Sequence, residues 1–133
     1  MEAEPAGSFS LQAHVSPSED PLKVKKAVEE VAGEASAVVE GERIVLSSES
    51  LHLLGHLREQ LRDRHVRSAA RRLMLAGNEG EKTTLMLNRQ AAAAGVVALC
   101  GTPEESPLGP IYLVIRAKKI EEAIDWLTSY EGG

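Results

Sequence analysis

The sequence predicts a single α+β domain with a mostly antiparallel β-sheet and helices packed on one face of it. The chain has 133 residues, a usual length for one domain. Apolar residues alternate with period two in some segments and recur every three or four residues in others, which gives the element order β-α-β-β-α-β-β-β-α. The connections between these elements are mostly short, which favours antiparallel pairing. We therefore expect one domain over residues 8–130, preceded by a flexible acidic tail at residues 1–7.

The first strand and the first helix have clear local signals. Residues 8–15 alternate apolar and polar, as a half-buried strand does. Asp20 and Pro21 are suited to the N-cap and the first position of a helix that Gly33 then closes. The face of this helix predicted to pack on the sheet consists of Leu22, Val24, Ala27, Val28 and Val31.

A hairpin and a leucine-rich helical region follow. Residues 37–39 and 44–46 flank Gly41, which can adopt the positive φ of a tight turn. From about Leu51, apolar residues repeat at a spacing of three and four as far as Gly77, so we expect one helix or two joined by a short kink near residues 63–65. The predicted buried positions are Leu51, Leu54, Leu57, Leu61, Val66, Ala69, Ala70 and Leu73.

The last third of the chain alternates between strands and helical turns. The predicted elements are a turn at 79–81, a strand at 83–88, a helical turn at 90–95, a buried strand at 96–100, an ordered loop at 102–110, a strand at 111–115 and a final helix from Ile120 to Leu127 closed by glycines 132–133. No internal repeat or low-complexity linker interrupts these elements, in agreement with a single domain.

Composition argues against several classes of protein. Cys100 is the only cysteine, so no disulfide within the chain and no cysteine metal motif is possible. His52 and His56 have a spacing that can bind zinc on a helix, but Leu53 replaces the glutamate of that motif, and we predict neither a metal site nor a cofactor. No apolar run reaches the roughly 20 residues of a membrane helix. Residues 1–7 lack the basic and apolar regions of a secretory signal, so we expect a cytoplasmic protein.

Charge is unevenly distributed along the chain. The net charge is −5, which by itself argues against a general nucleic-acid binder. Residues 51–100, however, contain eight Lys and Arg against four Asp and Glu, while the segments on either side are acidic. A local basic surface is therefore compatible with an acidic protein.

Four strings of the sequence together resemble a known family. They are Ser18-Glu19-Asp20-Pro21-Leu22-Lys23-Val24-Lys25-Lys26-Ala27-Val28, Leu87-Asn88-Arg89-Gln90-Ala91-Ala92, Glu105-Ser106-Pro107-Leu108-Gly109-Pro110-Ile111 and Ile124-Asp125-Trp126-Leu127. The chain resembles, from about Leu11 to Trp126, a family of small archaeal proteins described as predicted RNA-binding, exosome-associated proteins. The resemblance implies an α+β fold with an antiparallel sheet, similar to that of a ribosomal protein of the large subunit, and an association with RNA.

Arginines are concentrated in the second helical region and supply the candidate RNA contacts. A guanidinium forms bidentate, charge-assisted hydrogen bonds with phosphate, and a line of such groups can follow a nucleic-acid backbone. The alternative is a solvated helix face with local ion pairs such as Glu59–Arg62 and Asp63–Arg67. The candidate residues are Arg58, Arg62, Arg64, Arg67, Arg71, Arg72 and, after the strand at 83–88, Arg89.

Two further segments have both a functional and a structural interpretation. Arg89 and its neighbours at a strand end can contact RNA; alternatively, Asn88 caps the next turn and Arg89 pairs with an acid. The loop Ser106-Pro107-Leu108-Gly109-Pro110 has two prolines that restrict φ, so it is suited to be either a docking loop or a structural corner.

These observations favour a non-enzymatic protein that binds structured RNA mainly through phosphates, alone or within an RNA-processing or ribonucleoprotein assembly. Only four residues are aromatic, which argues against base stacking on an aromatic platform and favours recognition of RNA by shape and phosphate contact. No phosphate-binding loop or nucleophile–histidine motif indicates an enzyme. The alternative hypothesis is a protein–protein adaptor or homodimeric module that does not contact RNA.

Overall fold

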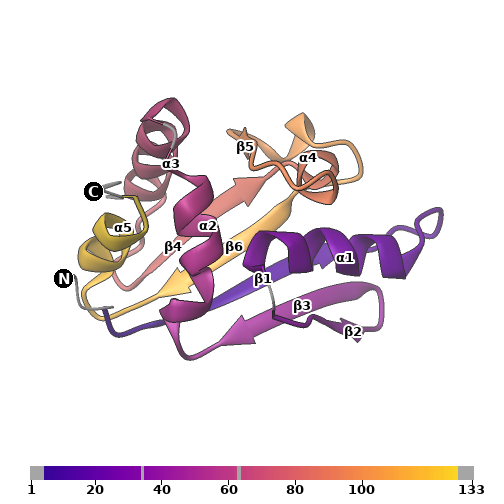
Figure 1. Ribbon diagram of the computed structural model, residues 1–133, viewed down its shortest axis with the longest axis horizontal. Coiled ribbons are helices and arrows are strands. Elements are labelled where there is room, and N and C mark those ends of the chain that lie inside the picture. Colours follow the sequence, from indigo (N-terminus) through magenta and orange to yellow (C-terminus); the bar gives the residue numbers. More distant parts are fainter. Residues whose placement is uncertain (1–4, 34, 63, 129–133) are drawn as a thin grey trace.

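The computed structural model describes residues 5–33, 35–62 and 64–128, which form one α+β domain (Figure 1). Six antiparallel strands are arranged in the order β2-β3-β1-β6-β4-β5. The strands are β1 (Ser8–His14), β2 (Val38–Glu40), β3 (Arg43–Ser48), β4 (Lys82–Leu87), β5 (Leu99–Cys100) and β6 (Ile111–Arg116). The helices are α1 (Pro21–Ala32), α2 (Gly55–Gln60), α3 (Arg64–Ala76), α4 (Arg89–Ala93) and α5 (Ile120–Thr128). The predicted fold class is confirmed.

Some predicted boundaries lie outside the described residues. This applies to the first four residues of the expected tail, to the domain end at residue 130 and to the closing glycines at 132–133. Gly7, also assigned to the tail, lies against β6: a Cβ added there would come within 2.8 Å of the Arg116 carbonyl oxygen. The chain is therefore packed against the sheet just before β1 begins.

Helix α1 begins and ends where the sequence predicts. The Asp20 side chain accepts a hydrogen bond of 3.0 Å from the Leu22 amide, and Gly33 closes the helix with φ +88°. The prediction was wrong for Leu22, whose side chain is 68% exposed. Leu22 lies nine residues before Val31, which is two and a half helical turns, so the two side chains point to opposite sides of the helix.

The hairpin and the kinked helical region are also as predicted. Gly41 has φ +63° between β2 and β3. A 3₁₀ helix at Leu51–Leu54 leads into α2, and α3 begins only at Arg64, so the region contains two α-helices instead of one. Leu51, Leu54, Leu57 and Leu61 are buried as predicted and anchor this region to the core, whereas Leu73 is only partly buried against it.

The segment before β6 departs from the prediction of a buried strand at residues 96–100. Only Leu99 and Cys100 pair with β4, and Val96 is 55% exposed. Just before β5 begins, the Ala98 carbonyl accepts a hydrogen bond from the amide of Asn88, the residue that follows β4. Helix α4 occupies the residues that a longer strand would need for pairing.

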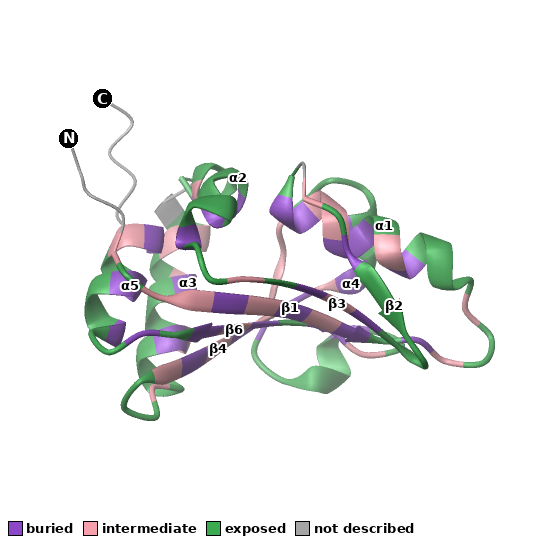
Figure 2. Ribbon diagram, turned by 90° about the horizontal axis from the view of Figure 1, so that it is seen from below, coloured by how far each residue is buried: buried purple, intermediate pink, exposed green. Residues whose placement is uncertain are grey.

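The two faces of the sheet differ in burial. Figure 2 shows α1 and α2 on one side of β1 and β3. Side chains facing the helices are buried, and they alternate along each strand with exposed or half-buried ones. The buried set comprises Phe9, Leu11, Ala13, Ile44, Leu46, Thr83, Leu85, Leu87, Ile111, Leu113 and Ile115. The opposite face of the sheet is left largely open.

Candidate nucleic-acid interface

The side chain of Arg58 on α2 contacts Trp126 on α5. Its Nε donates a 2.6 Å hydrogen bond to the Trp126 carbonyl oxygen, and its guanidinium carbon lies 5.1 Å from the centre of the Trp126 ring. The side chain therefore joins α2 to α5 by a hydrogen bond and a cation–π contact. Because α2 ends at Gln60 and α3 begins at Arg64, the arginines do not follow one continuous helix.

The arginines of α3 have different environments. Arg71 forms an ion pair with Asp125 of α5. Arg67 is half-buried, whereas the Arg64 side chain lies outside the described part of the chain. Arg62, which lies between α2 and α3, is exposed. Arg72 is exposed and has no ion pair with a described residue. The predicted basic surface is thus divided between side chains that connect helices and side chains on the surface.

Arg89 is buried, with a side chain only 5% exposed, and it forms an ion pair with Glu19. Nη1 lies 2.7 and 2.8 Å from the two oxygens of Glu19, which belongs to the connection between β1 and α1. The Asn88 side chain accepts from the Ala91 amide at 2.9 Å and caps α4. The structural interpretation of this segment is therefore confirmed, and the predicted contact of Arg89 with RNA has no exposed guanidinium to support it.

The surroundings of Glu19 shift the pKa of its carboxyl group. Partial burial acts to raise its pKa, but hydrogen bonds from the Ser16 amide and from Arg89, together with the charge of Arg89, lower the pKa below its ordinary value. Glu19 is therefore ionised at neutral pH, and the ion pair is intact.

The loop predicted for docking forms a turn that the buried side chain of Ser106 holds in place. Ser106 is buried, and its Oγ accepts from the Arg89 amide and donates to the Gly109 carbonyl, each at 3.0 Å. The Gly109 amide donates to the Ser106 carbonyl at 2.9 Å, which closes a four-residue turn with Pro107 at its second position. Leu108, at the third position, has φ +66° and a side chain 54% exposed.

The open face of the sheet forms cross-strand rows in register. One row runs Val45, Gln12, Tyr112 and Met86, across β3, β1, β6 and β4. The adjacent row on this face consists of Ser47, Ser10, Val114 and Thr84. Tyr112 is 36% exposed and lies near the middle of the face, because its strand β6 is paired with β1 on one side and with β4 on the other.

Cations occupy both ends of this face. Arg116 lies beside Lys82 at one end, and Arg43 lies beside His14 at the other. Among the described strand residues, Glu40 of β2 supplies the carboxylate on this face. Its Oε1 lies 3.5 Å from Nη2 of Arg43. Arg116 has no ion pair with any described residue. The strands themselves thus contribute three permanent positive charges to this face against one negative charge.

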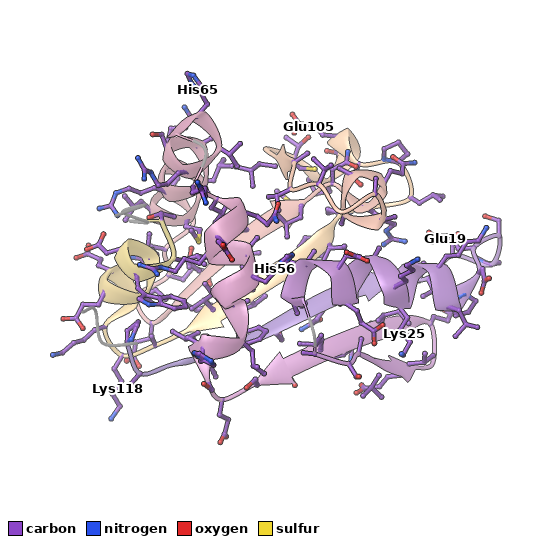
Figure 3. All side chains as sticks on the ribbon, in the orientation of Figure 1. Glu19, Lys25, His56, His65, Glu105 and Lys118 are labelled. Carbon is purple, nitrogen blue, oxygen red and sulfur yellow. The ribbon has the colours of Figure 1, made fainter. Side chains whose placement is uncertain are left out.

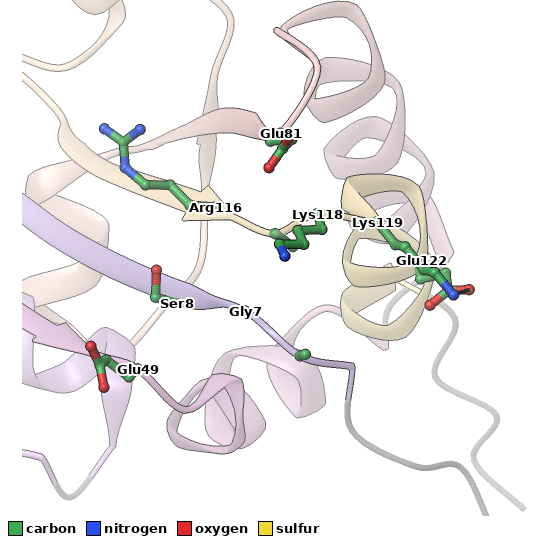
Figure 4. A pocket seen from close by; sticks show the side chains of 10 residues that line it. Gly7, Ser8, Glu49, Glu81, Arg116, Lys118, Lys119 and Glu122 are labelled. Atoms are coloured by element: carbon green, nitrogen blue, oxygen red, sulfur yellow. Dashed lines mark ion pairs between the residues drawn. The ribbon is translucent and has the colours of Figure 1, made fainter.

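A hollow of about 770 Å³ lies next to Arg116 (Figure 4). Its lining contains Arg116, Lys118 and Lys119, and also the carboxylates of Glu49, Glu81 and Glu122. A smaller hollow of about 400 Å³ continues from Ser8 and Arg116 onto the sheet face at Ser10, Ser47 and Val114, and Glu49 lines this hollow as well. The larger hollow has three cationic and three acidic side chains, whereas the smaller one combines Arg116 and Glu49 with serine side chains.

No group of three or more His, Cys, Asp or Glu residues suited to a metal ion occurs in the described part of the chain. Figure 3 places His56 on α2 and His65 at the far end of α3, well separated from each other. None of the described helices is long and apolar enough to cross a membrane.

The fold and this surface define a small α+β protein with a six-stranded antiparallel sheet that is open on one face. The chain belongs to the archaeal UPF0201 family. It is 36% identical over 120 residues to a UPF0201 protein from Metallosphaera sedula, covering 88% of this chain and 84% of the relative. It is 38% identical over 121 residues to UPF0201 protein TK1335 from Thermococcus kodakarensis, covering 88% and 86%. A scan against protein-family models found no match.

Solved structures agree with this assignment. The crystal structure of the UPF0201 protein from Methanococcus jannaschii matches with a TM-score of 0.75 and 27% identity, covering 91% of this chain and 98% of that one. Protein AF2318 from Archaeglobus fulgidus, described as DUF54, shares the fold with a TM-score of 0.69 at 20% identity. The membership of a family of small archaeal proteins that the four sequence strings predicted is thereby confirmed.

The residues of the sheet face were missed by a search for clusters along the sequence. Their signal was the polar half of each strand's alternation, as in Ser8, Ser10, Gln12 and His14 of β1. Alternation indicates which side chains of one strand share a face. It does not place Arg116 next to Lys82, because that neighbourhood depends on the strand order.

Proposed function

We propose that this protein is a non-enzymatic RNA-associated protein that contacts structured RNA mainly through phosphates, with the open face of the sheet as the contact surface. It acts alone or as a component of an RNA-processing or ribonucleoprotein assembly, such as the exosome association described for the family it resembles. The proposal rests on Arg116, an exposed cation on the open face that has no ion pair with a described residue. Lys82 lies beside it and Arg43 lies at the other end of the face, and these two pair with Glu79 and Glu40.

Charge and hydrogen-bonding capacity both suit a polynucleotide backbone. Ser10, Ser47 and Thr84 provide hydroxyl groups between the cationic ends, and such groups can bind phosphate or the 2′-hydroxyl of ribose. Arg116 is an exposed guanidinium without a carboxylate partner among the described residues, so it can bind phosphate without first breaking an ion pair. Because the net charge of the chain is −5, we expect RNA to bind only where cationic side chains lie on the surface and not over the whole protein.

The helical arginines are weaker candidates. Arg58, Arg71 and Arg89 already have partners on other elements. Binding phosphate through them would cost the energy of those contacts. Arg72 is exposed, but it lies outside the open sheet face and serves as a matched comparison for Arg116.

The test is a titration of the whole protein against fluorescently labelled RNA stem-loops at several salt concentrations. We expect Arg116→Gln to weaken binding about tenfold and to lower the slope of log affinity against log salt by about one, as loss of one phosphate contact should. Arg72→Gln removes the same charge from α3 and should leave affinity within about twofold. Both variants change an exposed side chain, so folding should be preserved and can be checked by circular dichroism.

Two outcomes would overturn this assignment. Absence of binding to any stem-loop at low salt would exclude the function. A larger loss in Arg72→Gln than in Arg116→Gln would transfer the contact surface from the sheet to α3. Charge reversal at Arg71 is a poorer test, because it would also disrupt the ion pair with Asp125.

A second candidate function is docking to a protein partner, and Leu108 is the observation that favours it. An exposed leucine in the left-handed region costs about 1–2 kcal/mol relative to a glycine-like turn residue. The turn below it is held by Ser106, so the side chain is presented on a rigid support. Crosslinking of the protein in extracts, compared with Leu108→Gly, tests this function: partners lost in the variant would support an adaptor, and an unchanged set would exclude this loop.

A further inference from the structure

We propose that Tyr112 is a stacking platform for one unpaired nucleobase, so that the RNA recognised is a single-stranded or looped segment and not a continuous duplex. This inference rests on the RNA-binding function proposed above and specifies the class of RNA. The other aromatic side chains within the described residues, Phe9 and Trp126, are buried or half-buried against the core. Tyr112 is thus the described aromatic residue available to a ligand on the open face.

The position of Tyr112 leaves the ring accessible. It lies on β6, with β1 and β4 directly beside it and β3 one strand farther away. Its cross-strand neighbours on this face are Gln12 and Met86, and the next row contains only Ser10, Val114 and Thr84 as neighbours. No charged side chain occurs in either row, so a planar base can lie on the ring without displacing an ion pair.

The polar groups beside Tyr112 can bind the edge of a base. The Gln12 amide nitrogen donates a 3.0 Å hydrogen bond to the Ser10 hydroxyl, which directs the Gln12 carbonyl oxygen away from that bond. This oxygen is then an acceptor for an N–H group of a base, and Met86 on the opposite side provides a polarisable apolar contact. Stacking, hydrogen bonding and apolar contact thus surround one position.

Arg116 and His14 lie on the two sides of Tyr112, at distances that suit neighbouring phosphates. Arg116 is four residues from Tyr112 along β6, about 13 Å at the rise of an extended strand. His14 is about 8 Å away, one strand across and two residues along from the partner Gln12. A phosphate on one side of a stacked nucleotide can therefore reach the Arg116 guanidinium, and a phosphate on the other side can reach a hydrogen-bonding ring nitrogen of His14. A base inside a duplex would be held away from the Tyr112 ring by its own stacking neighbours.

The experiment compares two labelled RNAs of the same length and composition. One is a hairpin with an unpaired loop, and the other is a fully paired duplex. The wild-type protein should prefer the hairpin. We expect Tyr112→Val, which retains a strand-forming residue, to weaken hairpin binding about tenfold without changing the salt slope, because the lost contact is uncharged. Tyr112→Phe, which retains the aromatic ring, should bind the hairpin within about twofold of the wild-type affinity.

The outcomes separate this inference from the function on which it rests. Retained hairpin preference in Tyr112→Val, or equal binding of hairpin and duplex by wild type, would overturn the stacking site while leaving phosphate-mediated RNA binding intact. Loss of binding in Tyr112→Phe as well as in Tyr112→Val would indicate that the hydroxyl and not the ring is used, which also contradicts stacking. Failure of every RNA to bind at low salt would overturn both proposals.

Discussion

The Arg89 guanidinium is bound by the Glu19 carboxylate, which lies 70 residues earlier in the chain. Both side chains are nearly buried, 5% and 11% exposed, and Arg89 Nη1 contacts both carboxylate oxygens. Through this pair the β1–α1 connection is joined to α4 and, by the Arg89 amide, to the turn at Ser106. Arg89 Nε and Nη2 are buried without a hydrogen-bond partner among the described residues, so Glu19 is the group that compensates the charge.

Glu19→Gln should therefore destabilise the protein strongly at neutral pH. Removing one partner of a nearly buried ion pair leaves an uncompensated charge, and we expect a loss of about 3–5 kcal/mol in the free energy of unfolding. Urea denaturation measures this value. The double variant Glu19→Gln with Arg89→Met removes both charges and should recover part of the loss; no recovery would mean that Glu19 acts through contacts other than Arg89.

The same pair predicts a dependence of stability on pH. The folded state lowers the pKa of Glu19 below 4.5, so its contribution is present above about pH 4.5 and is lost as the pH falls through the folded value. The stability difference between wild type and Glu19→Gln should therefore be constant near neutrality and shrink on acidification. Urea denaturation at a series of pH values provides the measurement. A difference that stayed constant down to pH 2 would contradict this assignment.

Arg58→Met should loosen the contact between α2 and α5. The variant loses a 2.6 Å hydrogen bond and a cation–π contact but retains most of the apolar stem, and we expect a loss of about 1–2 kcal/mol. Because Trp126 is the only tryptophan, its fluorescence should report the change directly. Arg72→Met, at an exposed position, is the matched control and should stay within about 0.5 kcal/mol of wild type. Equal effects in the two variants would contradict a specific role of Arg58.

Leu108→Gly should stabilise the folded protein despite adding a glycine. Glycine removes the cost of a left-handed leucine but increases the entropy of the unfolded chain, so we expect a net gain of up to about 1 kcal/mol. Leu108→Ala removes the side chain and retains the backbone strain, so it should give no such gain. Thermal unfolding of the three proteins is sufficient for the comparison, and a clear loss of stability in Leu108→Gly would show that the exposed side chain contributes to folding.

Much of the fold follows from interactions within a few residues of sequence. The start of α1 at Asp20 and Pro21, its end at Gly33 and the turn at Gly41 each depend on local backbone geometry. Strand periodicity likewise identified which side chains enter the core. The error at Leu22 occurred because nothing in the described part of the fold covers this apolar side chain. The error at residues 96–98 occurred because α4 occupies the residues with which a longer strand would pair. Local sequence reveals neither.

The candidate site depended on contacts that sequence order conceals. Arg58, Arg71 and Arg89 lie on α2, α3 and α4. Their partners are Trp126, Asp125 and Glu19, which lie 68, 54 and 70 residues away in the chain. Ion pairs and hydrogen bonds form between whatever groups packing brings together, so no helical spacing could identify them.

The sequence by itself determined the fold class, the element order, most core positions and the family to which the chain belongs. Only the tertiary structure decided which charges are free to bind a ligand. The strand order β2-β3-β1-β6-β4-β5 places Tyr112 and Arg116 of β6 between β1 and β4, and so assembles one open face from segments at both ends of the chain. The physical reason is that alternation along a strand is local, whereas the pairing of strands depends on the packing of the whole core.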